Sequence, residues 1–127
     1  MKPVFLLDSV ILIDHLRGLS GATRWLASLR EDEAVISPIT RAEVLCGGSA
    51  GENEAAAVLC DAFDCLPLTA EDATRAAAFK REHGGRLPDA FQAALALGHG
   101  LKLVTRNTKD FKERKFHFVE IPYKMKD

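Results

Sequence analysis

The sequence has 127 residues, of which 47% are hydrophobic and 28% charged, a profile that fits one globular domain and excludes a disordered chain or two full catalytic domains. Its formal net charge of −1 provides no whole-molecule field for attracting nucleic acid or an acidic membrane. The charges are nevertheless polarised: residues 28–72 hold two basic and ten acidic residues, whereas residues 73–127 hold twelve basic and six acidic. Cys46, Cys60 and Cys65 form no CxxC pair, so reduced thiols are expected rather than a disulfide framework or zinc site.

Short apolar runs alternate with longer segments of helical periodicity along the chain. The expected elements, in order, are a strand over Val4–Leu7, a helix to about Leu16, a helix over Ser20–Leu29, a strand over Ala34–Ile36, a helix from Thr40 to Gly47, a helix over about Asn53–Phe63, a strand over Cys65–Leu68, a helix from the Thr69 cap to His83, a helix from Pro88 to Leu97, a strand over Leu101–Thr105 and a candidate fifth strand over Phe118–Ile121. This alternation predicts right-handed crossovers and an α/β fold with three layers, α/β/α, around a mostly parallel sheet of about four or five strands. Residues 1–127 are expected to form a single domain.

The N-terminal apolar run is short. Asp8 and then Asp14 interrupt it before it reaches the length of a signal-peptide core or the ~20 residues of a membrane span. The sequence therefore predicts a cytoplasmic protein with no membrane association.

Several polar side chains follow the predicted strands. Asp8 comes directly after the first strand, Glu43 lies one helical turn beyond the second, and Asn107 and Asp110 lie in the loop after the fourth. Ligands of open parallel sheets bind beyond the carboxyl ends of the strands, so these residues are expected at one functional edge. Asp89, in the first turn of the helix before the fourth strand, could lie at either edge.

Carboxylates that converge without a basic partner repel one another and raise each other's pKa unless a cation lies between them. Oxygen ligands favour Mg²⁺ or Mn²⁺ over zinc. Such an ion lowers the pKa of a bound water, orients a phosphodiester and stabilises charge on its oxygens. Hydrolysis of a phosphodiester is therefore the leading chemistry.

Each acid also has a purely local explanation. The segment from Thr40 to Glu43 has the Thr-x-x-Glu form of a capping box, and Asp89 suits the dipole at a helix N-terminus. Asp110 can fix a turn, and Asp8 can cap the first helix. These explanations do not account for the collection of acids at one edge, which is the observation that favours a metal site.

Charged residues outside this edge have other expected roles. Asp14 is interpreted as structural, with Arg17 three residues later as a surface partner. Basic residues of the C-terminal half are candidates for contacts with backbone phosphates, although a solvated face explains most of them equally well. These candidates are Arg75, Lys80, Arg81, Arg86, Lys102, Arg106, Lys109, Lys112, Arg114 and Lys115.

Four segments carry a family resemblance. They are Val4-Phe5-Leu6-Leu7-Asp8-Ser9; Ser37-x-Ile39-Thr40-x-x-Glu43-Val44-x-x-Gly47; Leu87-Pro88-Asp89; and Leu103-Val104-Thr105-Arg106-Asn107 with Asp110-Phe111. In this order and spacing they resemble the PIN-domain nucleases, and within them the small toxins of VapC type from toxin–antitoxin pairs. The resemblance spans nearly the whole chain.

The resemblance implies a PIN-like fold and a Mg²⁺- or Mn²⁺-dependent endoribonuclease that hydrolyses RNA. Carried over to this sequence, it implies that Asp8, Glu43 and Asp89 are catalytic acids that bind the metal. It would make Ser9 or Thr40 minor polar supports. It further implies a small antitoxin that blocks the site, and homodimerisation.

The sequence departs from the family pattern at three positions. Many relatives carry Asp where this chain has Asn107, so either Asn107 or Asp110 is the fourth contributor, with Asp110 favoured slightly for its charge. Val10 occupies a place often filled by a small polar residue, and Gln92 stands where an aliphatic residue is common. The alternative to a nuclease is thus a catalytically weakened PIN-like module that binds RNA or protein, with Asn107 and Val10 as signs of decay.

Overall fold

The computed structural model describes residues 3–47, 50–107, 111 and 116–124. Its elements are β1 (Phe5–Leu7), α1 (Ser9–Leu16), α2 (Ser20–Ala27), β2 (Ala34–Ile36), α3 (Pro38–Leu45), α4 (Ala50–Asp61), β3 (Asp64–Cys65), α5 (Ala70–His83), α6 (Leu87–His99), β4 (Lys102–Val104) and β5 (Val119–Glu120). None of the helices among these described residues is long and apolar enough to cross a membrane.

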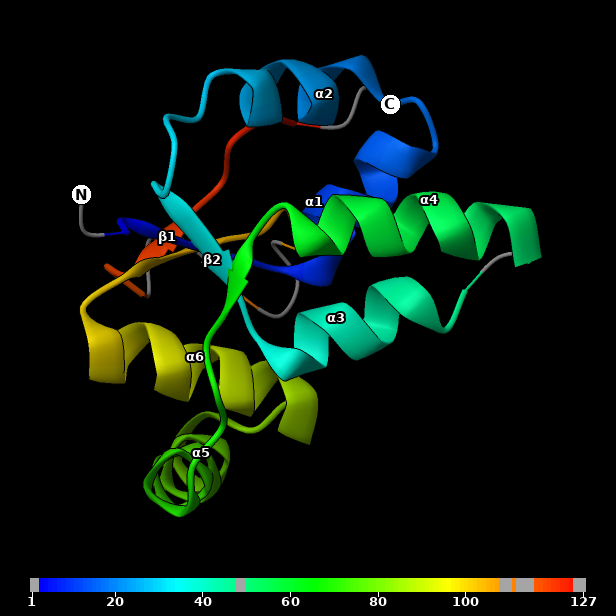
Figure 1. Cartoon of the computed structure of the whole chain (residues 1–127). Helices are drawn as coiled ribbons and strands as arrows, with labels where there is room; N and C mark the ends of the chain where they lie inside the picture. Colours follow the sequence, from blue (N-terminus) through cyan, green and yellow to red (C-terminus); the bar gives the residue numbers. More distant parts are fainter. Residues whose placement is uncertain (1–2, 48–49, 108–110, 112–115, 125–127) are drawn as a thin grey trace.

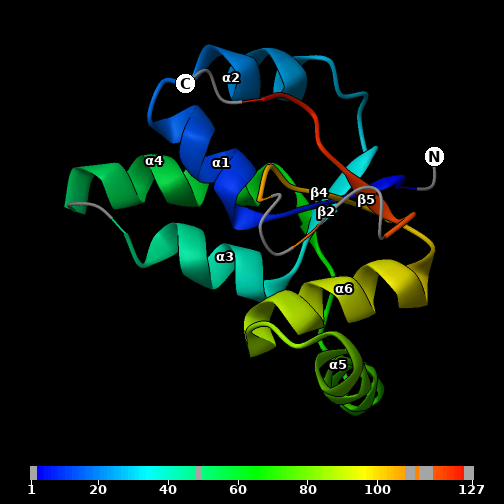
Figure 2. The same cartoon turned by 180° about the vertical axis from the view of Figure 1, so that it is seen from behind.

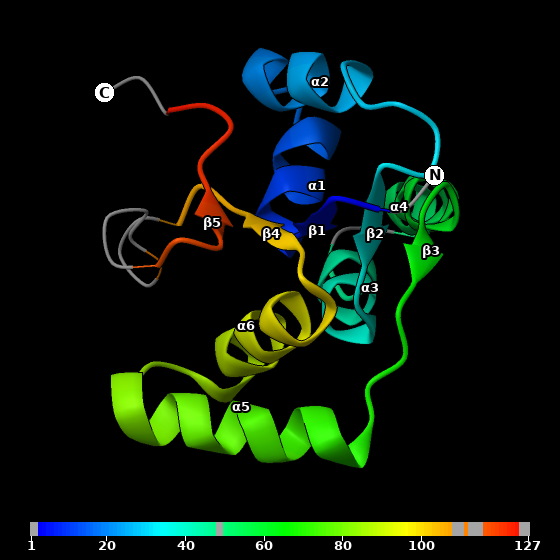
Figure 3. The ribbon, with the colours of Figure 1, turned by 90° about the vertical axis from the view of Figure 1, so that its left-hand side faces the viewer.

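Helices cover both faces of one parallel sheet (Figure 1), whose five strands lie in the order β3-β2-β1-β4-β5 (Figure 3). Leu6 of β1 is paired with Val35 of β2 on one side and with Leu103 of β4 on the other. β1 is therefore the central strand. The predicted three-layer α/β/α fold with a parallel sheet is confirmed, and Val119–Glu120 supplies the candidate fifth strand at one edge.

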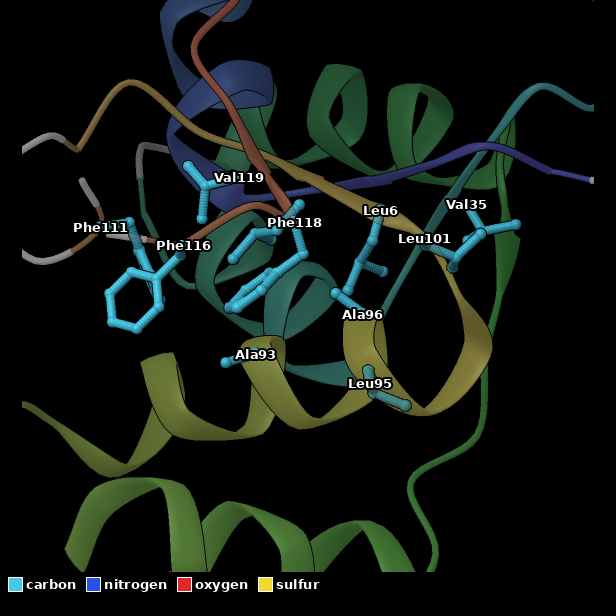
Figure 4. Packing of buried hydrophobic residues seen from close by; sticks show 11 residues of the cluster. Leu6, Val35, Ala93, Leu95, Ala96, Leu101, Phe111, Phe116, Phe118 and Val119 are labelled. Carbon is cyan, nitrogen blue, oxygen red and sulfur yellow. The ribbon is translucent and has the colours of Figure 1, made fainter. Parts of the chain in front are cut away.

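Alternating side chains divide the core between the two faces of the sheet. Leu6, Val35 and Leu103 belong to the cluster that includes the inner face of α6, with α5 packed behind it (Figures 3 and 4). Leu7 and Ile36 belong to a second cluster, which α1, α3 and α4 complete with their apolar residues. The strands read as continuous apolar runs because both faces are buried.

Local signals explain where most helices begin. Thr69 and Asp72 form a reciprocal capping box at the start of α5, at the predicted position. The predicted start of α3 at Thr40 is wrong, because α3 begins at Pro38, with Ser37 as its N-cap. A cap residue followed by proline in the first turn is a strong start signal, since proline lacks an N–H that would be unsatisfied there.

Two further features differ from, or extend, the predicted elements. The predicted strand over Cys65–Leu68 is wrong in its bounds, because β3 covers only Asp64–Cys65. After β5, the chain runs back toward α2 (Figure 2), where the Tyr123 ring packs against Gly21. The segment after β5 is thereby held against the N-terminal helices.

Candidate active site

Asp8 stands where the central strand ends and α1 begins. Its N–H donates to Val104 O at 2.9 Å, and its side chain caps α1 by accepting from Ser9 N at 2.9 Å. Its other oxygen, Oδ2, accepts from Thr105 Oγ1 at 2.7 Å, and Gln92 Nε2 lies 3.5 Å from Oδ1. The capping role predicted for Asp8 is confirmed, and the same carboxylate is held by Thr105, just after β4, and by Gln92 on α6.

Asp8 and Glu43 are neighbouring acids at the carboxyl edge. Ser9 Oγ donates to Glu43 Oε1 at 3.0 Å and so joins the two elements that carry the acids. Asp8 is 6% exposed. Burial raises the pKa of Asp8, and the charge of Glu43 adds to this, against the hydrogen bonds that the carboxylate accepts. Within the described residues the donors of these hydrogen bonds are neutral groups, so none of them brings a positive charge to the Asp8 carboxylate.

Glu43 does not take part in a capping box. Ser37 Oγ accepts from Thr40 N at 3.1 Å, and Thr40 Oγ1 donates to Leu7 O at 2.8 Å. The capping interpretation of the Thr40–Glu43 segment is therefore wrong, because Ser37 already caps α3. Glu43 instead bonds Ser9 and lies on the wall of a cavity of about 200 Å³ between α1, α3 and α4.

Asp89 lies in the first turn of α6, where Arg86 is the N-cap. Arg86 Nε is 3.5 Å from Asp89 Oδ2, and the Asp89 side chain is 14% exposed. Gln92, one turn further along α6, contacts Asp8. The N-terminal part of α6 is thus at the same edge of the sheet as Asp8, because a helix that leads into a parallel strand starts at the edge where that strand ends.

Two residues at this edge were not among the predicted site residues. Gln92 is 1% exposed, accepts from Ser37 Oγ at 2.7 Å through Oε1, and donates to Thr40 Oγ1 at 2.7 Å. Thr105, which follows β4 and is fully buried, donates to Asp8. The available signal for Gln92 was a single amide among the alanines of an apolar helix face.

The fourth predicted contributor is only partly described. Asn107 N donates to Thr105 Oγ1 at 3.0 Å, which links Asn107 to Asp8 through one hydroxyl. Asn107 O accepts from Phe111 N at 2.9 Å. Asp110, like the basic candidates Lys109, Lys112, Arg114 and Lys115, lies outside the described residues.

Asp14 belongs to a separate buried network. Its carboxylate, 2% exposed, accepts from Arg106 Nε and Nη2 and from Tyr123 Oη at 2.7 Å. Burial raises the pKa of Asp14, but the hydrogen bonds from Arg106 and Tyr123 outweigh it and leave the pKa below its ordinary value. Asp14 is structural, as predicted, but it is buried rather than at the surface, and its hydrogen-bonded cation is Arg106, while Arg17 acts on it through its charge alone. Arg106 is thus engaged by Asp14 rather than directed at a phosphate.

The acids at the carboxyl edge of the sheet offer the kind of ligand atom that a hard cation prefers. Asp8, Glu43 and Asp89 offer only oxygen atoms, which Mg²⁺ and Mn²⁺ prefer. In the part of the chain that the structure describes, no group of three or more His, Cys, Asp or Glu side chains is arranged to hold a metal ion. The structure thus joins Asp8 to Glu43 through Ser9 and places Asp89 one turn from Gln92, without gathering the three acids into one cluster.

Comparisons with known proteins point in one direction. A family model of the PIN domain matches residues 5–116. "Ribonuclease VapC10" of Mycobacterium tuberculosis is 35% identical over 114 residues, which cover 85% of this chain and 86% of that protein. A solved toxin–antitoxin complex from Klebsiella pneumoniae has a TM-score of 0.86 at 33% identity, over 94% of this chain and 98% of that chain. FitAcB from Neisseria gonorrhoeae shares the fold, with a TM-score of 0.74 at 24% identity, over 94% and 98%.

Proposed function

The chain belongs to the PIN-domain family, as its four motifs predicted, and we propose that it is a Mg²⁺- or Mn²⁺-dependent endoribonuclease and the toxin of a toxin–antitoxin pair. The observation that carries this proposal is the coupling of buried Asp8 to Glu43 through Ser9 at the carboxyl edge of the sheet. Similarity to a ribonuclease and to a toxin–antitoxin complex supports it.

Asp8, Glu43 and Asp89 would hold the cation, with Asn107 or Asp110 as the fourth contributor. A divalent cation supplies stabilisation of charge on the phosphodiester oxygens and lowers the pKa of the attacking water. The contacts of α3 and α6 with the end of the central strand, through Thr40 to Leu7 O and through Gln92 to Asp8, support this proposal, because open parallel sheets bind ligands at this edge.

Neighbouring polar groups keep two of the acids in place. Thr105 Oγ1 and Ser9 N each donate to a different oxygen of Asp8, which fixes the plane of the carboxylate. Ser9 Oγ holds Glu43 Oε1, and Thr40 Oγ1 ties α3 to the end of β1. These hydrogen bonds support the role that the family resemblance implies for Ser9 and Thr40, which is to hold the acids in place.

The proposed RNA substrate needs basic groups near the acids. Arg86 is best placed, because its side chain is 70% exposed and lies beside Asp89. Arg75, Lys80 and Lys102 each bond a neighbouring group in the protein, and an RNA phosphate would have to compete for them. The proposed contact is with phosphates, which position a nucleic acid without reading its sequence.

The proposal includes four further properties of the molecule. Residues 1–127 act as one nuclease domain in the cytoplasm. A small antitoxin protein blocks the site, and the nuclease forms a homodimer. The toxin–antitoxin complex among the similar structures supports the antitoxin.

Cleavage assays on a mixture of structured and unstructured RNAs, with Mg²⁺, Mn²⁺ or EDTA, test the proposed activity. We expect wild-type cleavage that needs the metal, and a loss of at least about 100-fold in Asp8→Asn and Asp89→Asn, since even changes to the partners of metal ligands cost about 10–100-fold. Asp61→Asn is the matched control, because Asp61 is an exposed acid, paired with Arg41, that is not among the proposed metal ligands. A folded wild type that is inert toward all the RNAs would contradict the proposal and favour the binding module.

A further inference from the structure

We propose that Gln92 is a positioning residue, whose side-chain amide joins the strand end that carries Asp8 to the helices that carry Glu43 and Asp89. This inference rests on the proposed nuclease function, since it concerns the same site. Gln92 is buried on α6, three residues after Asp89, and its partner Thr40 lies on α3, three residues before Glu43. The amide therefore sits one helical turn from each helix-borne acid.

The hydrogen-bond pattern gives the amide one orientation. Thr40 Oγ1 donates its only hydrogen to Leu7 O, so toward Gln92 it acts as an acceptor, and it accepts from Nε2 at 2.7 Å. Ser37 Oγ accepts from Thr40 N and donates its hydrogen to Gln92 Oε1 at 2.7 Å. The amide nitrogen, rather than the oxygen, therefore faces Asp8, 3.5 Å from Oδ1.

Asp8 is consequently held from two sides. Gln92 on α6 approaches Oδ1, while Thr105, after β4, donates to Oδ2 at 2.7 Å. Ser9 N also donates to Oδ1, so the three donors leave one lone pair of the carboxylate, on Oδ2, available to a cation. Gln92 and Thr105 together restrict the rotation of the acid that both the sequence and the fold place at the centre of the site.

Packing alone does not account for Gln92. An aliphatic side chain would fill the same space between α6 and the sheet, whereas a buried amide is costly unless its donor and acceptor are both paired. Here Ser37 Oγ donates to the amide oxygen of Gln92, and Thr40 Oγ1 and Asp8 Oδ1 accept from its amide nitrogen. The hydrogen-bond partners of the Gln92 amide are therefore Asp8 itself and two residues, Ser37 and Thr40, at the start of the helix that carries Glu43.

Gln92→Met tests this role, because methionine keeps the length and volume of the side chain but cannot make these hydrogen bonds. Leu95→Val is the matched control, since Leu95 is equally buried on the same helix but belongs to the apolar core. For both variants, calorimetry without RNA measures the affinity for Mn²⁺, and cleavage assays measure kcat and KM for RNA. We expect Gln92→Met to weaken Mn²⁺ binding and lower kcat by about 10–100-fold, with KM within about threefold of wild type and no such change in Leu95→Val.

The outcomes separate this inference from the proposed function. A wild type that binds no Mn²⁺ and cleaves no RNA overturns both. If the wild type is active, and Gln92→Met and Leu95→Val have the same Mn²⁺ affinity and the same kcat, only the role of Gln92 is overturned. If Gln92→Met does not fold, the Mn²⁺ affinity of Ser37→Gly tests the inference instead. Glycine is tolerated at a helix N-cap, but the substitution removes the hydroxyl that orients the Gln92 amide. Unchanged Mn²⁺ affinity in that variant overturns the inference, and weakened affinity supports it.

Discussion

Replacing Tyr123 by phenylalanine removes one hydroxyl and keeps the ring that packs on Gly21. In the wild type the hydroxyl donates to Asp14 Oδ2 at 2.7 Å, inside the protein. A hydrogen bond to a charged group contributes about 1.5–3 kcal/mol. Because Arg106 keeps its two bonds to Asp14, we expect the low end of this range, about 1.5 kcal/mol, and a fall in Tm of about 5 °C.

The size of this loss depends on the charge of Asp14. The pKa of Asp14 in the folded protein lies below the ordinary value of 3.8, because the bonds from Arg106 and Tyr123 outweigh the effect of burial. Its stabilising contribution is present above pH 3.8 and is lost as the pH falls toward the folded-state pKa. The difference between Tyr123→Phe and wild type should therefore be constant near neutral pH and shrink below about pH 4.

Urea unfolding followed by the fluorescence of Trp25, the single tryptophan of the sequence, measures this difference at each pH. Tyr123 is also the single tyrosine, so ultraviolet titration reports its phenol alone. Burial raises the pKa of Tyr123, and the hydrogen bond to Asp14 adds to this, so the folded protein should resist ionisation well beyond pH 10. Equal stability of variant and wild type at pH 7, or a loss that does not shrink in acid, would refute the reasoning.

Two other predictions use the same unfolding assays. Mn²⁺ at 100 times its dissociation constant should stabilise the wild type by about 2.7 kcal/mol in an EDTA-reversible way, and Asp8→Asn should abolish that gain. Gly21→Ala should destabilise the fold by about 1 kcal/mol or more, because the new Cβ would lie 3.2 Å from Tyr123 Cγ in an anchored ring. Gly98→Ala should be neutral or stabilising by up to about 1 kcal/mol, because its Cβ would lie 2.6 Å from Arg75 Nη1, the end of a flexible side chain that can shift, and 4.0 Å from Asp72 Oδ1, an ordinary contact. Equal effects of the two substitutions would contradict this contrast.

Features with a local cause could be predicted from the sequence. Ala34–Ile36 is a strand as expected, because a continuous apolar run suits a strand buried on both faces. The helix from the Thr69 cap to His83 also has its predicted bounds, because each end is marked by a signal within a few residues of it: the capping box at the start and Gly84 at the end. The parallel sheet, and with it the shared edge of the strand-end residues, followed from the alternation of such elements.

Features that depend on tertiary contacts could not be predicted. The partner of Asp14 is Arg106, 92 positions away, and nothing near Asp14 in the chain reveals it. Gln92 is 84 positions from Asp8, and a lone amide on an apolar helix does not disclose which hydroxyls satisfy it. The register between α6 and the sheet sets the partners of Gln92, the placement of α1 beside the end of β4 sets the pair of Asp14 and Arg106, and packing of the whole core determines both.

The central place of β1 affects how the protein responds to partial opening. Fraying of a sheet starts at its outermost members, which here are the two-residue strands β3 and β5. β2 and β4 still flank β1 after either margin detaches, so Asp8 keeps the backbone bond to Val104 that anchors it. The margins can therefore loosen while the middle of the sheet stays intact.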